Sequence, residues 1–173
     1  MSNDKRLKLA VQKSGRLADE SRDLLEKCGI TFTKSKDQLF CAAQNFPMDV
    51  FFIRDDDIPA FVASGVCQVG IVGQNVLCEE SLSSSNQKIR TVEEVMTLNF
   101  GKCRLSIAVP YAVDYTDAKS LQGKVIATSY EGLLSAYLSR NGVTADIVDM
   151  RGSVEIAPRF GMADAICELV SSG

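Results

Sequence analysis

Short apolar runs of strand length alternate with helix-forming segments along the chain, and this alternation limits the folds that the chain can adopt. The runs at 7–11 and 48–53 read as strands, whereas the apolar positions of 17–28 recur at helical spacing. Further strands are predicted at 38–43, 66–73, 103–110, 124–129, 145–150 and 164–170, and further helices at 58–64, 74–80, 133–142 and 152–161. This order predicts an α/β protein with mainly parallel sheets.

The chain has 173 residues, which is enough for one domain or for two small lobes. We expect a division at Phe100–Gly101–Lys102, with residues 1–100 in a first lobe and residues 101–173 in a second. A cleft between two lobes is a common ligand site. No run approaches the roughly 20 apolar residues of a membrane span, so the sequence predicts a soluble, cytoplasmic protein with no membrane partner.

The composition excludes several kinds of chemistry. The chain has no histidine, so neither a histidine-based catalytic triad nor a histidine metal ligand is possible. Its six cysteines are scattered without a C-x-x-C pair, and we expect buried, reduced thiols rather than metal ligands. The net charge of −3 is spread over both lobes, which argues against a nucleic-acid partner. Any catalysis must use carboxylates, lysines, arginines and the backbone.

Three cations of the first lobe follow predicted strands. Lys13 and Arg16 lie in the turn "QKSGR" after the first strand, and Arg54 follows the strand "DVFFI". The carboxyl ends of parallel strands and the start of a helix both favour anions such as phosphates. The alternatives are a solvated turn for "QKSGR" and, for Arg54, an inward-facing side chain paired with one of the aspartates that follow it.

Two glycines and three acids complete the set of candidates. Gly70 and Gly73 bracket an apolar strand, where glycine permits the close approach of a ligand or, more commonly, of a packed neighbour. Glu155 suits either sugar hydroxyls or the start of a helix. Asp164 and Glu168 share one face of the predicted last strand, which leads into "SSG". Acids beside a small-residue loop suit a ribose 5-phosphate, and a plain edge strand is the alternative.

Seven stretches, taken in order, resemble ATP phosphoribosyltransferase, the enzyme that opens histidine biosynthesis: "QKSGRL", "IRDDDIP", "GVCQVGIVGQNVL", "CRLSIAVP", "ATSY", "GSVEIAPR" and "ADAICELVSSG". The resemblance runs from Lys8 to Gly173, and its start is similar to the long form of the family. It implies a two-lobed architecture like that of periplasmic binding proteins, with the active site between the lobes. It also implies a glycosyltransferase, in which adenine N1 of ATP attacks C1 of phosphoribosyl pyrophosphate and pyrophosphate leaves.

Carried onto this chain, the resemblance implies that Arg16 and Arg54 are the catalytic cations and that Lys13 supports them. The other candidates would contact the substrates, with the last three beginning the loop for the 5-phosphate: Gly70, Gly73, Glu155, Asp164, Glu168, Ser171, Ser172 and Gly173. Mg²⁺ would be held mainly by substrate phosphates rather than by a protein metal site. The partners would be ATP and phosphoribosyl pyrophosphate, and we expect a homo-oligomer.

Three features depart from the family pattern. Gln68 stands where the family usually has an acid, and Glu131 stands where proline tends to follow "ATSY". The chain stops at Gly173, so we expect it to lack the C-terminal regulatory domain and to bind its substrates more weakly. The alternative function is a two-lobed module that binds a nucleotide or phosphate ligand without catalysis.

Overall fold

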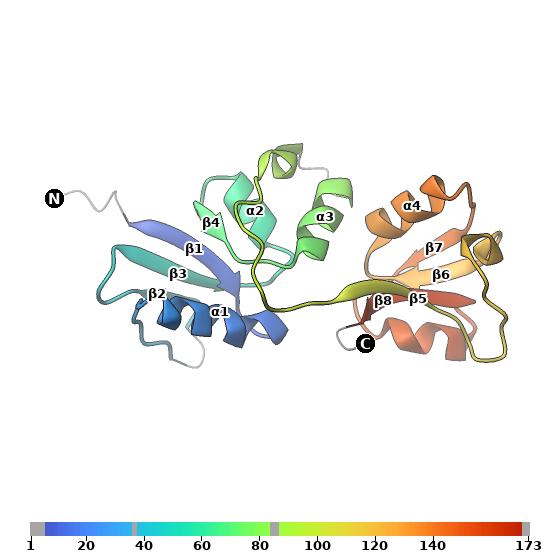
Figure 1. Cartoon of the computed structure of the whole chain (residues 1–173), viewed down its shortest axis with the longest axis horizontal. Helices are drawn as coiled ribbons and strands as arrows, with labels where there is room; N and C mark the ends of the chain where they lie inside the picture. The colour runs from blue at the N-terminus through green and yellow to red at the C-terminus, as the bar shows by residue number, and fades with distance from the viewer. Residues whose placement is uncertain (1–5, 36–37, 84–86, 171–173) are drawn as a thin grey trace. The chain divides into compact units, whose positions relative to one another are not determined.

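The computed structural model describes residues 6–35, 38–83 and 87–170 (Figure 1). It divides into two compact units between Gly101 and Lys102, within the stretch at which the sequence predicts a boundary. The first unit contains β1 (Leu7–Gln12), α1 (Arg16–Lys27), β2 (Phe40–Ala42), β3 (Met48–Ile53), α2 (Ile58–Ala63), β4 (Val69–Gly70), α3 (Gln74–Ser83) and the 3₁₀ helix η1 (Gln87–Thr91). The second contains β5 (Arg104–Ala108), the 3₁₀ helix η2 (Ala118–Leu121), β6 (Val125–Thr128), α4 (Glu131–Arg140), β7 (Asp146–Asp149), the 3₁₀ helix η3 (Val154–Phe160) and β8 (Ala165–Val170).

The first sheet has the strand order β2-β3-β1-β4. β1 runs parallel to β3 and β4, and β2 joins the edge antiparallel to β3. Successive side chains of β1 point to opposite faces, so Leu9 and Val11 pack with Leu25 of α1. Ala10 packs with Ile58 of α2 on the other face. The sheet therefore lies between α1 and α2, as Figure 1 shows.

The second sheet repeats this plan with the order β5-β8-β6-β7. β6 is parallel to β7 and β8, and β5 is antiparallel to β8. Ile126 of β6 packs with Leu134 of α4, whereas Ala127 packs with Val154 of η3. The predicted α/β class with mainly parallel sheets is confirmed.

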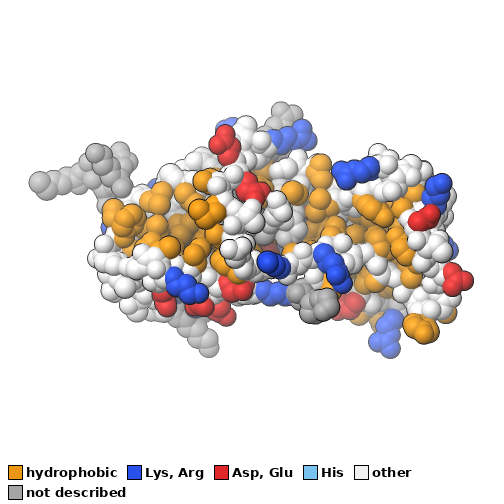
Figure 2. Space-filling model, in the orientation of Figure 1, with side chains coloured by type: hydrophobic (Ala, Val, Ile, Leu, Met, Phe, Trp, Pro, Cys, Tyr) orange, Lys and Arg blue, Asp and Glu red, His pale blue; other side chains and the backbone are white. Residues whose placement is uncertain are grey.

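Neither the charge distribution on the face drawn in Figure 2 nor the described helices indicate a nucleic-acid or membrane surface. On the face drawn in Figure 2, acidic and basic side chains are interspersed over each unit. Within the part of the chain that the structure describes, no helix combines the length and the apolar character that crossing a bilayer requires.

Two predicted elements differ from the structure. The helix predicted at 152–161 is the 3₁₀ helix η3, because Pro158 in its interior has no N–H with which to continue an α-helix. The strand predicted at 66–73 is reduced to Val69–Gly70. A Cβ on Gly70 would lie 2.5 Å from Cγ2 of Ile58, so this glycine lets α2 pack closely against β4.

The prediction of buried cysteines is right for three positions and wrong for three. Cys41, Cys67 and Cys167 are buried, whereas Cys28, Cys78 and Cys103 are exposed. Cys28 follows the last turn of α1. Burial raises the pKa of the Cys41 and Cys67 thiols.

We predict that a thiol reagent such as Ellman's reagent reacts with three cysteines rapidly in the folded chain and with the other three only after unfolding. The reagent attacks thiolates, which burial both shields and disfavours. Absorbance at the two stages measures the two groups. As a control, Cys28→Ser should remove one rapidly reacting thiol and leave the slow group at three. Rapid reaction of all six in the folded chain would contradict the described core.

Candidate functional site

The carboxyl ends of β1, β3 and β4 meet at one edge of the first sheet, here named the first-sheet edge. Gln12, the last residue of β1, lies opposite Ile53, the last residue of β3. The backbone N–H of Lys13 donates to the Ile53 carbonyl at 2.7 Å. After β4, the N–H of Ile71 donates to the Ala10 carbonyl at 2.9 Å. The residues that follow the three strands are thereby held side by side.

All three predicted cations of the first unit lie at the first-sheet edge with exposed side chains. Lys13 follows β1, Arg16 is the first residue of α1, and Arg54 follows β3. Gly15, with a φ of 102°, makes the turn into α1, and a Cβ there would lie 2.7 Å from the side-chain amide of Gln12. The partial positive charge at the start of α1 adds to the charges of the side chains. Exposed cations beside a helix start make this edge electrostatically favourable for anions.

Arg54 forms a two-pronged ion pair with Asp56. Its Nε and Nη2 donate to Oδ1 and Oδ2 of Asp56 at 3.0 and 2.7 Å. This hydrogen bonding, together with the charge of Asp56, raises the pKa of Arg54. The alternative of an inward arginine paired with an aspartate is therefore right about the partner and wrong about the direction, since Arg54 is exposed. The guanidinium side chain is 71% exposed, and it has five N–H donors, so donors remain for an anion.

The two glycines have structural roles, one in packing and one in backbone hydrogen bonding. Gly70 accommodates α2, as described above. The carbonyl of Gly73 accepts hydrogen bonds from the N–H groups of Val76 and Leu77 at 3.0 and 3.1 Å, at the start of α3. A contact of either glycine with a nucleotide stays a prediction.

A second group of polar side chains lies at the carboxyl ends of β6, β7 and β8, here named the second-sheet edge. The Ser129 hydroxyl donates to the Met150 carbonyl at 2.7 Å and lies 3.4 Å from Oε2 of Glu168. The buried Thr128 hydroxyl donates to the Cys167 carbonyl at 2.7 Å. These bonds tie the ends of the three strands together and place the half-buried Glu168 carboxylate beside a hydroxyl group.

The structure separates Asp164 from Glu168, contrary to the expectation that both acids lie beside "SSG". Asp164 precedes β8, and its Oδ2 accepts a hydrogen bond from the Val125 N–H at 2.8 Å, at the start of β6. Four residues of extended chain span about 13 Å, so Asp164 lies at the amino ends of the strands and Glu168 at the carboxyl ends. A shared strand face does not bring two side chains to the same end of the strand.

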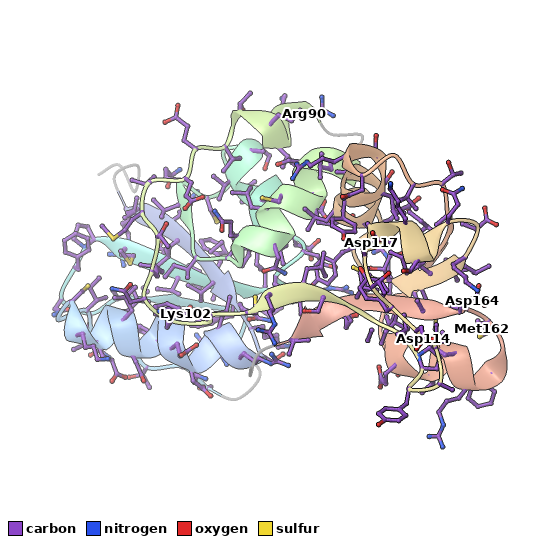
Figure 3. All side chains as sticks on the ribbon, turned by 45° about the vertical axis from the view of Figure 1, so that its right-hand side comes forward. Arg90, Lys102, Asp114, Asp117, Met162 and Asp164 are labelled. Atoms are coloured by element: carbon purple, nitrogen blue, oxygen red, sulfur yellow. The ribbon has the colours of Figure 1, made fainter. Side chains whose placement is uncertain are left out.

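The amino ends of the second sheet border a cavity of about 350 Å³. Asp114, Lys124, Met162 and Asp164 contribute to its lining, and Figure 3 shows three of them, Asp114, Met162 and Asp164, near one another. This cavity is distinct from the second-sheet edge, because it lies at the opposite ends of the strands.

Gln68 binds the backbone of the central strand in the first unit in the same way as Asp164 does in the second. Its Oε1 accepts from the Lys8 N–H at 2.9 Å, and its own N–H donates to the Lys8 carbonyl at 3.0 Å. The Asp164 N–H likewise donates to the Val125 carbonyl at 2.7 Å. We name these two arrangements the amino-end clamps. An amide oxygen serves in such a clamp without a charge, so glutamine at position 68 is compatible with the fold.

No hydrogen bond or ion pair within the described residues links Glu155 to either group. Glu155 is exposed in the first turn of η3, where no side-chain cap bond forms. Ser171, Ser172 and Gly173 lie outside the described residues. Conversely, sequence reasoning assigned no role to Thr128 and Ser129. Their position between a buried strand and the start of α4 is the signal that points to them.

The arrangement of sheets and helices indicates the structural class to which the chain belongs. Each unit is a mainly parallel sheet between helices, with polar groups at the carboxyl ends. The alkanesulfonate-binding protein SsuA from Xanthomonas axonopodis pv. citri, bound to MOPS, has a similar fold, with a TM-score of 0.51 at 14% identity over 97% of this chain and 55% of that one. The chain therefore has the two-unit architecture found among periplasmic binding proteins.

Residues 54–173 match the family model of HisG, ATP phosphoribosyltransferase, and the chain belongs to this family. The ATP phosphoribosyltransferase of Cytophaga hutchinsonii is 52% identical over 96% of the chain, and that of Maricaulis maris is 49% identical over 97%. The chain spans 56% of the length of each. The ATP phosphoribosyl transferase (HisG:HisZ) complex from Thermotoga maritima has a similar structure, with a TM-score of 0.75 at 26% identity over 96% of this chain and 75% of that one.

We predict that the amino-end clamp at Asp164 contributes to stability through its oxygen and not through its charge. Asp164→Asn retains an oxygen acceptor and should unfold in urea at nearly the wild-type midpoint. Asp164→Leu leaves the Val125 N–H without this acceptor and should lose about 1 kcal/mol of unfolding free energy. Equal losses in both variants would show that the carboxylate charge matters.

Proposed function

We propose that the protein transfers the phosphoribosyl group of phosphoribosyl pyrophosphate to N1 of ATP and releases pyrophosphate, as the first step of histidine biosynthesis. The observation that carries the proposal is the 52% identity to an ATP phosphoribosyltransferase over 96% of the chain. The family match includes Arg54 and Glu168, one from each edge, together with the 171–173 stretch.

The reaction needs alignment and charge neutralisation rather than a covalent nucleophile. The bond from C1 of the ribose to the pyrophosphate oxygen breaks as the bond from adenine N1 to C1 forms, and negative charge grows on the leaving pyrophosphate. In the proposal, Arg16 and Arg54 bind the nucleotide and the pyrophosphate, and Lys13 supports them. Preorganised cations stabilise charge that develops in the transition state, and holding both reactants in line lowers the entropic cost of the step.

The second-sheet edge is proposed to bind the ribose. Glu168 would accept hydrogen bonds from sugar hydroxyls, and the Leu169 N–H, which donates to its Oε1 at 2.8 Å, would keep its carboxylate in position. Residues 171–173 would begin the loop that binds the 5-phosphate. Glu155 remains a proposed ribose contact. The carboxylate of Asp164 is engaged in its amino-end clamp, so a direct role in ribose binding is not part of the proposal.

Mg²⁺ is proposed to accompany the substrates. Among the described residues, no group of three or more acids or cysteines is arranged to hold a metal ion. Mg²⁺ commonly keeps several waters and binds substrate phosphates with one or two carboxylates, and Glu168 is a carboxylate that fits this requirement. When bound, the ion would neutralise phosphate charge.

Assembly and location belong to the same proposal. The similar Thermotoga structure is a complex of HisG with HisZ. We propose that this protein also acts in an assembly, as a homo-oligomer, and that it works in the cytoplasm. Light scattering on the purified protein measures the assembly.

We predict that the chain supports phosphoribosyl transfer when the rest of a relative is present. In a chimera, residues 1–173 would replace the matching part of the Cytophaga hutchinsonii enzyme, with which they share 52% identity. Incubation with ATP, phosphoribosyl pyrophosphate and Mg²⁺ should yield phosphoribosyl-ATP and pyrophosphate, measured by chromatography and by a coupled pyrophosphate assay. A folded chimera that binds a substrate but forms no product would instead favour the non-catalytic binding module.

We predict that Arg16→Ala and Arg54→Ala in this chimera each lower kcat by on the order of 10²-fold or more, since each removes a cation from the developing pyrophosphate charge. Arg140→Ala is the matched control, because Arg140 is an exposed arginine in the last turn of α4, away from both edges, and it should have little effect. Near-normal kcat values in both test variants would refute these two roles.

A further inference from the structure

The two sheets share one arrangement of three parallel strands. The order is β3-β1-β4 in the first sheet and β7-β6-β8 in the second. In each sheet the central strand is parallel to both neighbours. A position in one set of strands can therefore be matched with a position in the other, once a common reference point is known.

The amino-end clamps supply this reference point. Gln68 and Asp164 each bind the backbone of the central strand through one side-chain oxygen and one N–H. The central-strand residues that directly follow the clamped positions are Leu9 in β1 and Ile126 in β6. These two residues are therefore equivalent, and each is buried in the core of its unit.

The register across the sheets then leads to two arginines. The residues opposite the reference positions are Val50 in β3 and Ile147 in β7. The fourth residue after Val50 is Arg54, and the fourth residue after Ile147 is Arg151. β3 and β7 occupy equivalent places in their sheets, and each arginine follows the carboxyl end of its strand. Arg151 thus lies at the second-sheet edge as Arg54 lies at the first.

The two arginines differ in what surrounds them along the chain. Arg54 is followed by three aspartates and is paired with Asp56. Arg151 is followed by Gly152 and Ser153, and its exposed side chain forms no hydrogen bond or ion pair within the described part of the chain. A guanidinium stays charged at any physiological pH, so Arg151 presents an unneutralised fork of donors at this edge.

We propose that Arg151 binds a phosphate group of phosphoribosyl pyrophosphate, as the counterpart in the second unit of Arg54. The inference rests on the proposed function, and it adds a residue to the substrate site. The same edge carries the Glu168 carboxylate beside Ser129. A carboxylate suits sugar hydroxyls, and a planar guanidinium suits phosphate oxygens, so the two side chains together match a phosphorylated ribose.

The test measures phosphoribosyl pyrophosphate binding to the 173-residue chain by isothermal titration calorimetry in the presence of Mg²⁺. Arg151→Ala should raise Kd by about tenfold or more, and Arg151→Lys should recover part of the loss, because lysine keeps the charge without the fork. The matched control is Arg159→Ala, an exposed arginine of η3 in the same unit, which should bind like the wild type. The thermal unfolding midpoint should be unchanged in all variants, since a structural role would shift it.

The outcomes separate the two proposals. Binding by the wild type with equal Kd values for Arg151→Ala and Arg159→Ala would overturn the role of Arg151 and leave the proposed function standing. Equal weakening by Arg151→Ala and Arg159→Ala would also overturn it, because it would show a general effect of positive charge. No binding by the wild type, together with an inactive chimera, would overturn the proposed function and the inference with it.

Discussion

The parallel pairing of a central strand with both of its neighbours is the constraint on which the rest of each unit depends. Parallel neighbours place their carboxyl ends at the same edge of a sheet, so residues far apart in sequence meet there whether or not their side chains contact one another. In the first unit this pairing gathers Lys13, Arg16 and Arg54. In the second it gathers Ser129 and Glu168.

The two ends of each sheet have different tasks. At the carboxyl ends, the candidate binding side chains Lys13, Arg16, Arg54 and Glu168 are exposed or half-buried and suit phosphates and sugar hydroxyls. At the amino ends, Gln68 and Asp164 use a side-chain oxygen to bind the backbone of the central strand. Because an amide oxygen accepts such a bond as a carboxylate does, the departure at Gln68 has a structural explanation. It therefore gives no support to a binding module without catalysis.

Most elements of the fold could be predicted from the sequence, because the signals for them are local. Apolar periodicity and the glycines that end helices mark β1, α1 and α4 at nearly their observed positions. The exceptions lie where packing decides. The strand around Gly70 is shorter than predicted, and α2 packs so closely against it that a Cβ there would meet Ile58. The exposure of Cys28 depends on where it falls after α1, and its apolar surroundings in sequence do not reveal this.

The candidate site shows the same division. By itself, the sequence determined which chemical groups are present, that the three cations of the first unit follow strands, and the motif order that resembles one family. Only the tertiary structure decided that Asp164 and Glu168 lie at opposite ends of β8, that Arg54 pairs with Asp56, and that Arg151 matches Arg54 in position. The physical reason is that strand direction and register arise from pairing between distant segments, and local periodicity carries no information about that pairing.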